Sequence, residues 1–214
     1  MHNKLLSAVL GLGLALGVSG TACADAIYTL DAIDSSIGGS GPYGTVDVHL
    51  IDSTHATITF TANTAGFFWF MGGTGSAGVN VNAASWALGV ITGDCSSCTY
   101  SDDGSGNEDG FGNFNQRVTS SNSSPGGRSS VISFDLTDLS GTWADAFAVL
   151  TNNDKGNQVA AHVGYCPQGI TGECTTGFAN ASGPPVLQTP EPGMLSLLAI
   201  GLLALGFTAR RRPS

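Results

Sequence analysis

The segment His55–Ala62, with the sequence HATITFTA, contains the alternation on which the fold prediction rests. Successive side chains of a β-strand point to opposite faces of a sheet, so a period of two separates an apolar face from a polar one. In this segment Ile58 and Phe60 fall on one face, whereas three threonines fall on the other. The segment therefore predicts a half-buried antiparallel strand.

Similar short apolar runs recur on both sides of this segment. The stretches between them are rich in glycine, asparagine and serine, and the chain contains 31 glycines. Such residues supply the positive φ angles and preset turns that hairpins need. About ten short strands at close spacing are typical of a sandwich or jelly-roll. We therefore predict an all-β fold whose body is an antiparallel β-sandwich or jelly-roll. The expected strands are 27–30, 45–50, 55–62, 67–71, 78–81, 86–91, 111–119, 131–136, 146–151 and 159–165.

The first 24 residues have the pattern of a secretory signal peptide. Lys4 is basic, an apolar stretch follows it, and residues 22–24 (Ala-Cys-Ala) form a small-x-small cleavage site. We expect residues 1–24 to form a signal-peptide helix that is removed on export. A retained membrane helix and a lipoprotein acylated at Cys23 are the alternatives.

The C-terminal segment combines three features in a fixed order. Residues 190–192 are Pro-Glu-Pro, residues 194–209 are apolar except for a serine and a threonine, and residues 210–212 are three arginines. As a helix, the apolar stretch would rise about 24 Å, slightly less than the thickness of a bilayer core. Arginines beside a membrane segment stay on the cytoplasmic side. The physical properties alone therefore predict a transmembrane helix that leaves the body on the far side of the membrane.

The same order of features resembles the PEP-CTERM sorting domain of Gram-negative bacteria. In that family an exosortase, a membrane-embedded enzyme similar to cysteine transpeptidases, recognises the signal and removes the tail. The resemblance implies that an exosortase is a partner and that the precursor is anchored in the inner membrane. It also implies a final location at the cell surface or outside the cell, in a class associated with exopolysaccharide and biofilm. The residues that carry the resemblance are Pro190, Glu191 and Pro192, together with Arg210, Arg211 and Arg212.

The terminal segments leave enough chain for one exported domain. We expect a signal peptide at 1–24, a β-sandwich domain at 25–180, a linker at 181–189 and the sorting signal at 190–214. Between residues 25 and 190 there are 15 acidic and 3 basic residues, a net charge of −12. Nucleic acid is not expected as a partner, because binding it depends on basic side chains that neutralise phosphates.

Four cysteines remain in this body once the signal peptide is removed. An even number of cysteines in an exported domain indicates disulfides. Cys95 and Cys98 lie in one local loop, and Cys166 and Cys174 lie in another, so we favour pairing within each loop. A zinc site made of four thiolates and a redox-active Cys95–Cys98 motif are the alternatives.

An acidic, glycine-rich stretch at 102–110 is the candidate metal site. Oxygen ligands on a flexible backbone suit Ca²⁺, and Asp102, Asp103 and Asp109 would be its ligands. The stretch lacks the first acidic residue and the terminal glutamate of an EF-hand loop. We favour a solvated hairpin loop, with a looser calcium site as the alternative, and we predict no other cofactor.

Motifs of catalysis are missing from the sequence. It contains no Gly-x-Ser-x-Gly, no His-Glu-x-x-His and no phosphate-binding or dinucleotide-binding glycine loop. We therefore predict a surface or extracellular matrix protein that is not an enzyme. One alternative is a carbohydrate-binding module that stacks sugars on the aromatic residues at 67–70, Trp86, Trp143 and Tyr165. The other is an extracellular hydrolase with two facing carboxylates.

Overall fold

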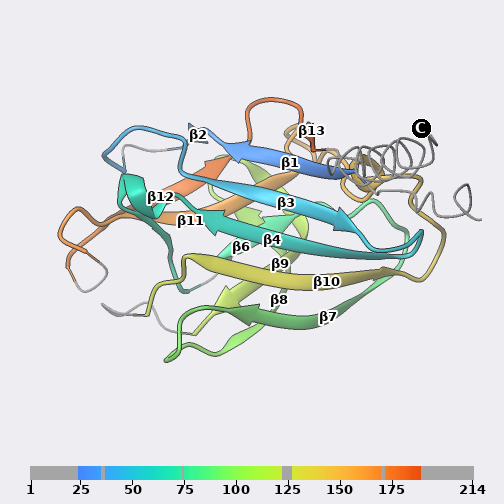
Figure 1. The fold of residues 1–214 in the computed structure, drawn as a ribbon, viewed down its shortest axis with the longest axis horizontal. Helices are drawn as coiled ribbons and strands as arrows, with labels where there is room; N and C mark the ends of the chain where they lie inside the picture. The colour runs from blue at the N-terminus through green and yellow to red at the C-terminus, as the bar shows by residue number, and fades with distance from the viewer. Residues whose placement is uncertain (1–23, 35–36, 74, 122–126, 170–171, 189–214) are drawn as a thin grey trace, which may run out of the picture. The chain divides into compact units, whose positions relative to one another are not determined.

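The computed structural model describes residues 24–34, 37–73, 75–121, 127–169 and 172–188. The strands of this part of the chain lie in two antiparallel sheets, one in front of the other in Figure 1. The first sheet has the strand order β13-β1-β3-β4-β10-β7. The second has the order β2-β12-β11-β6-β9-β8, and β5 pairs with β11. The described residues therefore form an all-β, sandwich-like body, which confirms the fold class predicted from the sequence.

The two sheets are built from segments scattered along the chain. In the first sheet the strands are β13 (Val186–Gln188), β1 (Asp25–Leu30), β3 (Gly44–Leu50), β4 (His55–Ala62), β10 (Val131–Asp138) and β7 (Trp86–Gly93). In the second they are β2 (Ala32–Ile33), β12 (Thr175–Asn180), β11 (Val159–Tyr165), β6 (Ala77–Val79), β9 (Gly112–Ser120), β8 (Tyr100–Glu108) and β5 (Phe68–Phe70). Two short 3-10 helices, η1 (Thr64–Gly66) and η2 (Ala146–Ala148), lie in the connections.

The core lies between the sheets, on the apolar faces that the alternation predicted. On β4, Ile58 and Phe60 are fully buried. Phe60 stands opposite Val46 of β3 and Ile132 of β10 in the register of the first sheet. Its ring also meets Phe70 of the second sheet edge-on, with 6.0 Å between the ring centroids. Full burial of each such side chain contributes about 1.5–3 kcal/mol, so this contact is one of those that hold the two layers together.

Both favoured disulfides are present in the structure. Cys95 bonds to Cys98 in the connection between β7 and β8. Cys166 bonds to Cys174 in the connection between β11 and β12. All four sulfurs are thus engaged in disulfides, and the structure does not show the alternative zinc-bound or reduced arrangements.

Two parts of the secondary-structure prediction are wrong. The expected strand at 146–151 is wrong in its first half, because residues 146–148 form the 3-10 helix η2, in which the Asp145 side chain accepts a hydrogen bond from the Ala148 N–H. In its second half, Leu150 makes an antiparallel β-bridge with Val81. The expected loop at 102–110 is mostly the strand β8, followed by a turn at 109–110. β8 lies at the end of its sheet order and pairs with β9 alone among the described strands, so most of its side chains face solvent and show no apolar alternation.

Strands β2, β12 and β13 were not anticipated from the sequence. β13 lies within the segment expected to be a linker, where it pairs with β1 in the register Ala26–Leu187. It ends at Gln188, the last described residue.

No described helix is long and apolar enough to cross a membrane. The expected transmembrane helix at 194–209 lies outside the described residues. So does the expected signal-peptide helix, except for Ala24.

Candidate functional site

The three candidate calcium ligands do not form one site. Asp102 and Asp103 lie on β8, whereas Asp109 lies in the turn after it. The side chain of Gln116 donates a hydrogen bond of 2.8 Å to Asp102, and the Gly75 N–H donates one of 3.0 Å to Asp103. Among the residues that the structure describes, no three His, Cys, Asp or Glu side chains are grouped so that they could hold a metal ion. Calcium binding stays a prediction without an assembled ligand set.

A buried charge cluster lies where β8 pairs with β9, and it consists of the buried Glu108 and Arg117 and of Asp103, whose side chain is 23 % exposed. Glu108 is fully buried and Arg117 is 7 % exposed. Arg117 Nη2 lies 2.9 Å from Asp103 Oδ2, whereas Arg117 Nη1 lies 3.8 Å from Glu108 Oε1. Neither oxygen of Glu108 has a hydrogen-bond partner. Arg117 is therefore paired chiefly with Asp103.

Burial dominates the protonation of Glu108. It raises the pKa of Glu108 from 4.5 to about 9, against the opposing effect of Arg117 and with a further increase from Asp103. Removing a carboxylate from water without hydrogen bonds favours its neutral form. Glu108 is thus a neutral acid at neutral pH, and the cluster contains one ion pair beside it.

Glycines make room for the buried charge cluster. A Cβ atom on Gly75, whose φ is +68°, would lie 2.1 Å from Glu108 Oε1. A Cβ atom on Gly106 would lie 2.4 Å from the Arg117 guanidinium. Part of the glycine content that the sequence suggests for turns therefore serves close packing around buried charged side chains.

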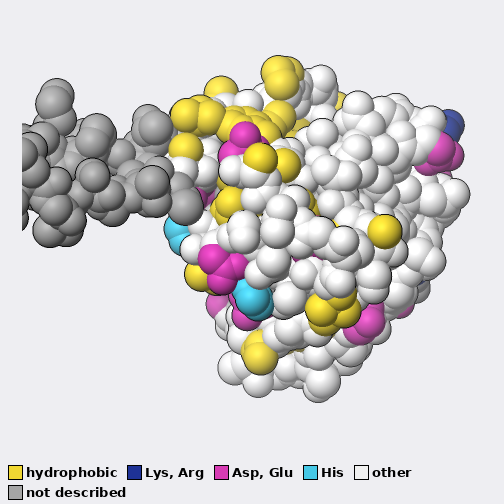
Figure 2. All heavy atoms as spheres, turned by 90° about the vertical axis from the view of Figure 1, so that its right-hand side faces the viewer, with side chains coloured by type: hydrophobic (Ala, Val, Ile, Leu, Met, Phe, Trp, Pro, Cys, Tyr) yellow, Lys and Arg dark blue, Asp and Glu magenta, His cyan; other side chains and the backbone are white. Residues whose placement is uncertain are grey.

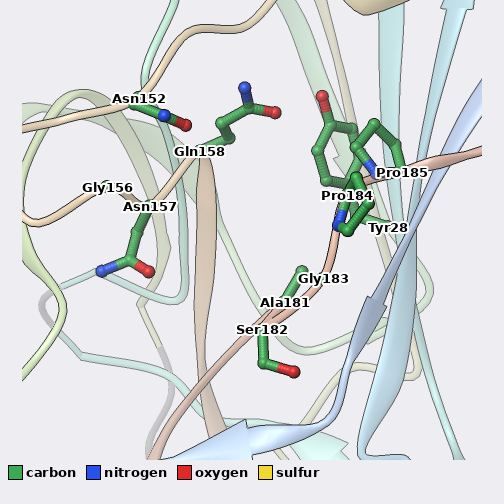
Figure 3. A pocket seen from close by; sticks show the side chains of 10 residues that line it. All are labelled: Tyr28, Asn152, Gly156, Asn157, Gln158, Ala181, Ser182, Gly183, Pro184 and Pro185. Atoms are coloured by element: carbon green, nitrogen blue, oxygen red, sulfur yellow. The ribbon is translucent and has the colours of Figure 1, made fainter.

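A pocket with a volume of about 360 Å³ lies beside β1, as Figure 3 shows. Its walls come from β1, from the connection between η2 and β11, and from the connection between β12 and β13. None of its lining side chains is charged. The lining residues are Tyr28, Asn152, Gly156, Asn157, Gln158, Ala181, Ser182, Gly183, Pro184 and Pro185.

Two polar groups of this pocket have no partner within the protein. Tyr28 is 2 % exposed, and its hydroxyl makes no hydrogen bond. The Gln158 side-chain oxygen is likewise buried without a partner. Figure 3 shows the Gln158 side chain extending on the same side of the pocket as the Tyr28 hydroxyl. Burial raises the pKa of Tyr28 well above its ordinary value, so the phenol stays neutral.

Hydrogen bonds fix the walls of the pocket. Asn157 donates from its side chain to the Phe111 carbonyl at 2.8 Å, and its backbone N–H donates to Asn153 at 3.0 Å. On the opposite wall, the Ser182 N–H donates to the Asp31 carboxylate at 2.9 Å. The pocket is therefore preformed by the fold.

The aromatic residues named for sugar stacking do not form one exposed platform. Phe68, Phe70 and Trp143 are buried in the core. Phe67 is 46 % exposed, while Trp69 of β5 is half-buried. These residues therefore do not form the exposed aromatic face that the carbohydrate-binding alternative predicted.

The charged side chains on one face of the body are spread out (Figure 2). Figure 2 shows acidic side chains scattered over one face, with hardly any basic side chain among them. This distribution offers no concentrated charged patch on the face shown.

Sequence reasoning missed the residues that the structure makes most distinctive: Tyr28, Glu108, Arg117 and Gln158. One signal was available for Tyr28, which occupies a buried position between Ala26 and Leu30 in an alternating strand. No comparable signal singled out Glu108 or Gln158, because their burial depends on which strands become neighbours.

Comparison with known families concerns the tail. The PEP-CTERM protein-sorting motif matches residues 188–212, a range that contains the Pro-Glu-Pro element and the three arginines. No match was found among curated proteins or among solved structures. The chain thus contains a PEP-CTERM protein-sorting motif. The motif implies export, an anchored precursor and processing by an exosortase. The predicted roles of Pro190–Pro192 and Arg210–Arg212 concern residues outside those that the structure describes.

Proposed function

We propose that this chain is an exosortase-processed surface or extracellular matrix protein, associated with exopolysaccharide, whose body has no catalytic activity of its own. The observation that carries the proposal is the sorting motif at residues 188–212. It begins at Gln188, a residue of β13, so the start of the motif overlaps the last described strand. The tail then acts as a temporary anchor, and the β-sandwich body is the part delivered to the surface.

Features of the body support delivery outside the cytoplasm. Both pairs of body cysteines form disulfides, as is typical of oxidising compartments. The excess of 15 acidic over 3 basic residues between positions 25 and 190 favours solubility after release. Glu108, whose pKa burial raises to about 9, is fully buried and so is a poor candidate for a catalytic acid.

Expression in a native host with and without its exosortase tests the proposal. Cell fractions and medium would be separated, and the intact mass of the protein would be measured in each. We expect a shortened chain at the surface or in the medium when the exosortase is present. Without it, a longer chain should stay in the membrane fraction. A full-length chain in the medium of both strains would overturn the proposal.

Matched variants of the tail make the assay specific. Replacing Pro190 and Pro192 with alanine should leave the precursor unprocessed, because it alters the recognised element alone. Pro213→Ala lies outside the matched range 188–212 and should be processed normally. Equal processing of both variants would show that the Pro-Glu-Pro element is not the recognition sequence.

A further inference from the structure

The pocket beside β1 has the dimensions of a small-ligand site. Its volume of about 360 Å³ lies at the lower end of the range usual for such sites, about 300–1,000 Å³. The hydrogen bonds of Asn157 and Ser182 fix two of its walls before any ligand arrives. A preformed pocket of this size suits a ligand of about one sugar unit.

The Tyr28 hydroxyl indicates that this pocket binds a ligand. A buried hydroxyl that makes no hydrogen bond is rare in a folded protein, because its burial removes water without replacing it. The Tyr28 hydroxyl is such a group, and the Gln158 oxygen beside the same pocket is a second. A ligand with hydroxyl groups, which both donate and accept hydrogen bonds, would supply a partner to each of these two groups.

The remaining lining residues define the chemical class of the ligand. No lining side chain is charged, so a carboxylate, phosphate or ammonium group would enter without a counter-charge. Asn152 and Gln158 carry amide groups that can donate and accept hydrogen bonds. Pro184 and Pro185 add apolar surface of the kind that packs against the C–H faces of a sugar ring. These features together favour a neutral, polyhydroxylated ligand.

We propose that this pocket binds one neutral sugar unit, with the Tyr28 hydroxyl and the Gln158 amide as its hydrogen-bonding anchors. The unit is either a free sugar or part of a neutral polysaccharide chain. The inference rests on the pocket and not on processing of the tail, and it gives the proposed association with exopolysaccharide a molecular contact.

Binding would be measured by isothermal titration calorimetry on the full chain in a zwitterionic detergent without a sugar headgroup. Maltoside and glucoside detergents are avoided, because their headgroups are themselves probes for the pocket. One arm titrates glucose, galactose, mannose and N-acetylglucosamine separately, and a second titrates dextran. Glucuronate and glucosamine are the charged counterparts. We expect saturable binding of at least one neutral probe, and binding at least tenfold weaker of its charged counterpart.

The two arms separate the sources of the ligand. Binding of a monosaccharide with no gain for the polymer indicates a free sugar or a chain end. Binding of dextran with no detectable affinity for glucose indicates recognition of a unit within a chain. Both results support the pocket. No saturable binding of any neutral probe up to about 10 mM, or equal affinity for the charged sugars, would overturn the inference.

Paired tyrosine variants locate the binding at this pocket. Tyr28→Phe removes only the hydroxyl, and we expect it to weaken binding about tenfold without lowering the melting temperature. Tyr165→Phe makes the same chemical change on β11, away from the pocket, and should leave binding unchanged. Gln158→Leu gives an independent second test and should also weaken binding. Sugar binding that persists unchanged in Tyr28→Phe and Gln158→Leu would overturn the assignment, whatever the sorting assay shows.

Discussion

The buried charge cluster and the pocket beside β1 both contain buried polar atoms without hydrogen-bond partners, but only those of the pocket belong to residues that line a cavity. Glu108 lies beside Arg117 and beside Gly75 and Gly78, where an added Cβ atom would lie 2.1 Å and 3.2 Å from its side chain. Tyr28 and Gln158 line a volume of about 360 Å³. A buried carboxyl group without a hydrogen-bond partner, such as that of Glu108, makes stability depend on its protonation. A polar group on a residue that lines a pocket can instead form its missing hydrogen bond with a ligand. The difference separates a structural element from a binding site.

The largest expected effect comes from breaking the charge cluster. Arg117→Leu would leave Asp103 as a carboxylate without its cation, in an environment where Arg117 itself is only 7 % exposed. Breaking a fully buried ion pair costs about 3–5 kcal/mol. Because the Asp103 side chain is 23 % exposed and also accepts a hydrogen bond from the Gly75 N–H, we expect a loss at the lower end of this range, about 3 kcal/mol, in the free energy of unfolding. Chemical denaturation measures it. Lys155→Leu on the exposed connection before β11 is the control and should change stability by less than about 0.5 kcal/mol. Equal losses in both variants would contradict the role of the cluster.

The second effect is a dependence of stability on pH. Because the folded pKa of Glu108 is about 9 and the ordinary value is 4.5, the folded protein keeps a proton that the unfolded chain releases between these values. Stability should therefore fall as pH rises through this window, by at most about 1.4 kcal/mol per pH unit.

Glu108→Gln isolates this contribution. The glutamine side chain is neutral at every pH. Subtracting the unfolding free energy of the variant from that of the wild type therefore removes the contribution of other titrating groups. The remaining difference should vary with pH because of Glu108 alone. Denaturation series at pH 5, 6, 7 and 8, spaced at about one unit to resolve the expected slope, provide the measurement. A difference that stays constant across the series would show that Glu108 is ionised in the folded protein.

A smaller effect is expected from filling the space around Glu108. Gly75→Ala places a methyl group against the Glu108 carboxyl and strains a backbone with φ of +68°. We expect a destabilisation of about 2 kcal/mol. Gly104→Ala is a matched control, because its φ is +62° and no atom lies within 4 Å of the added carbon. It carries the backbone strain without the contact, so a cost as large as that of Gly75→Ala would show that packing against Glu108 is not the cause.

The smallest effect on stability is expected at the pocket. Tyr28→Phe removes a buried hydroxyl without a partner, so we expect the free energy of unfolding to stay unchanged or to rise by about 1 kcal/mol. Thermal unfolding without ligand would measure this. A loss greater than about 1 kcal/mol would reveal a hydrogen bond of this hydroxyl in the free protein and would remove its availability to a ligand.

Alternation of apolar residues is the part of the fold that the sequence reveals. β4 and β11 have the predicted bounds, and β3 and β10 differ only at their ends, because each presents an apolar face to the core. β8 was missed, since its serine, aspartate and glycine residues do not alternate in polarity. η2 was mistaken for a strand, because the apolar run after Asp145 hides the effect of its cap. Local pattern therefore predicts strands that cover the core, and it fails where a neighbour decides the structure.

The disulfides and the pocket likewise differ in how far the sequence predicts them. Both disulfides join cysteines within single loops, so spacing was sufficient to favour them. The pocket joins Tyr28 to residues more than a hundred positions later in the chain, and its existence depends on how strand β1 and two connections meet. The sorting motif needs no fold at all, because it is a linear signal at 188–212.

The most direct test of the central claim is C-terminal mass analysis of the protein recovered from the surface or medium of an exosortase-containing host. The account predicts that the recovered chain lacks the apolar stretch 194–209 and the arginines 210–212, while its peptides through β13 remain. The same analysis without the exosortase should find peptides that contain Ser214 in the membrane fraction. Recovery of surface protein that still ends at Ser214 in the exosortase-containing host would contradict the account.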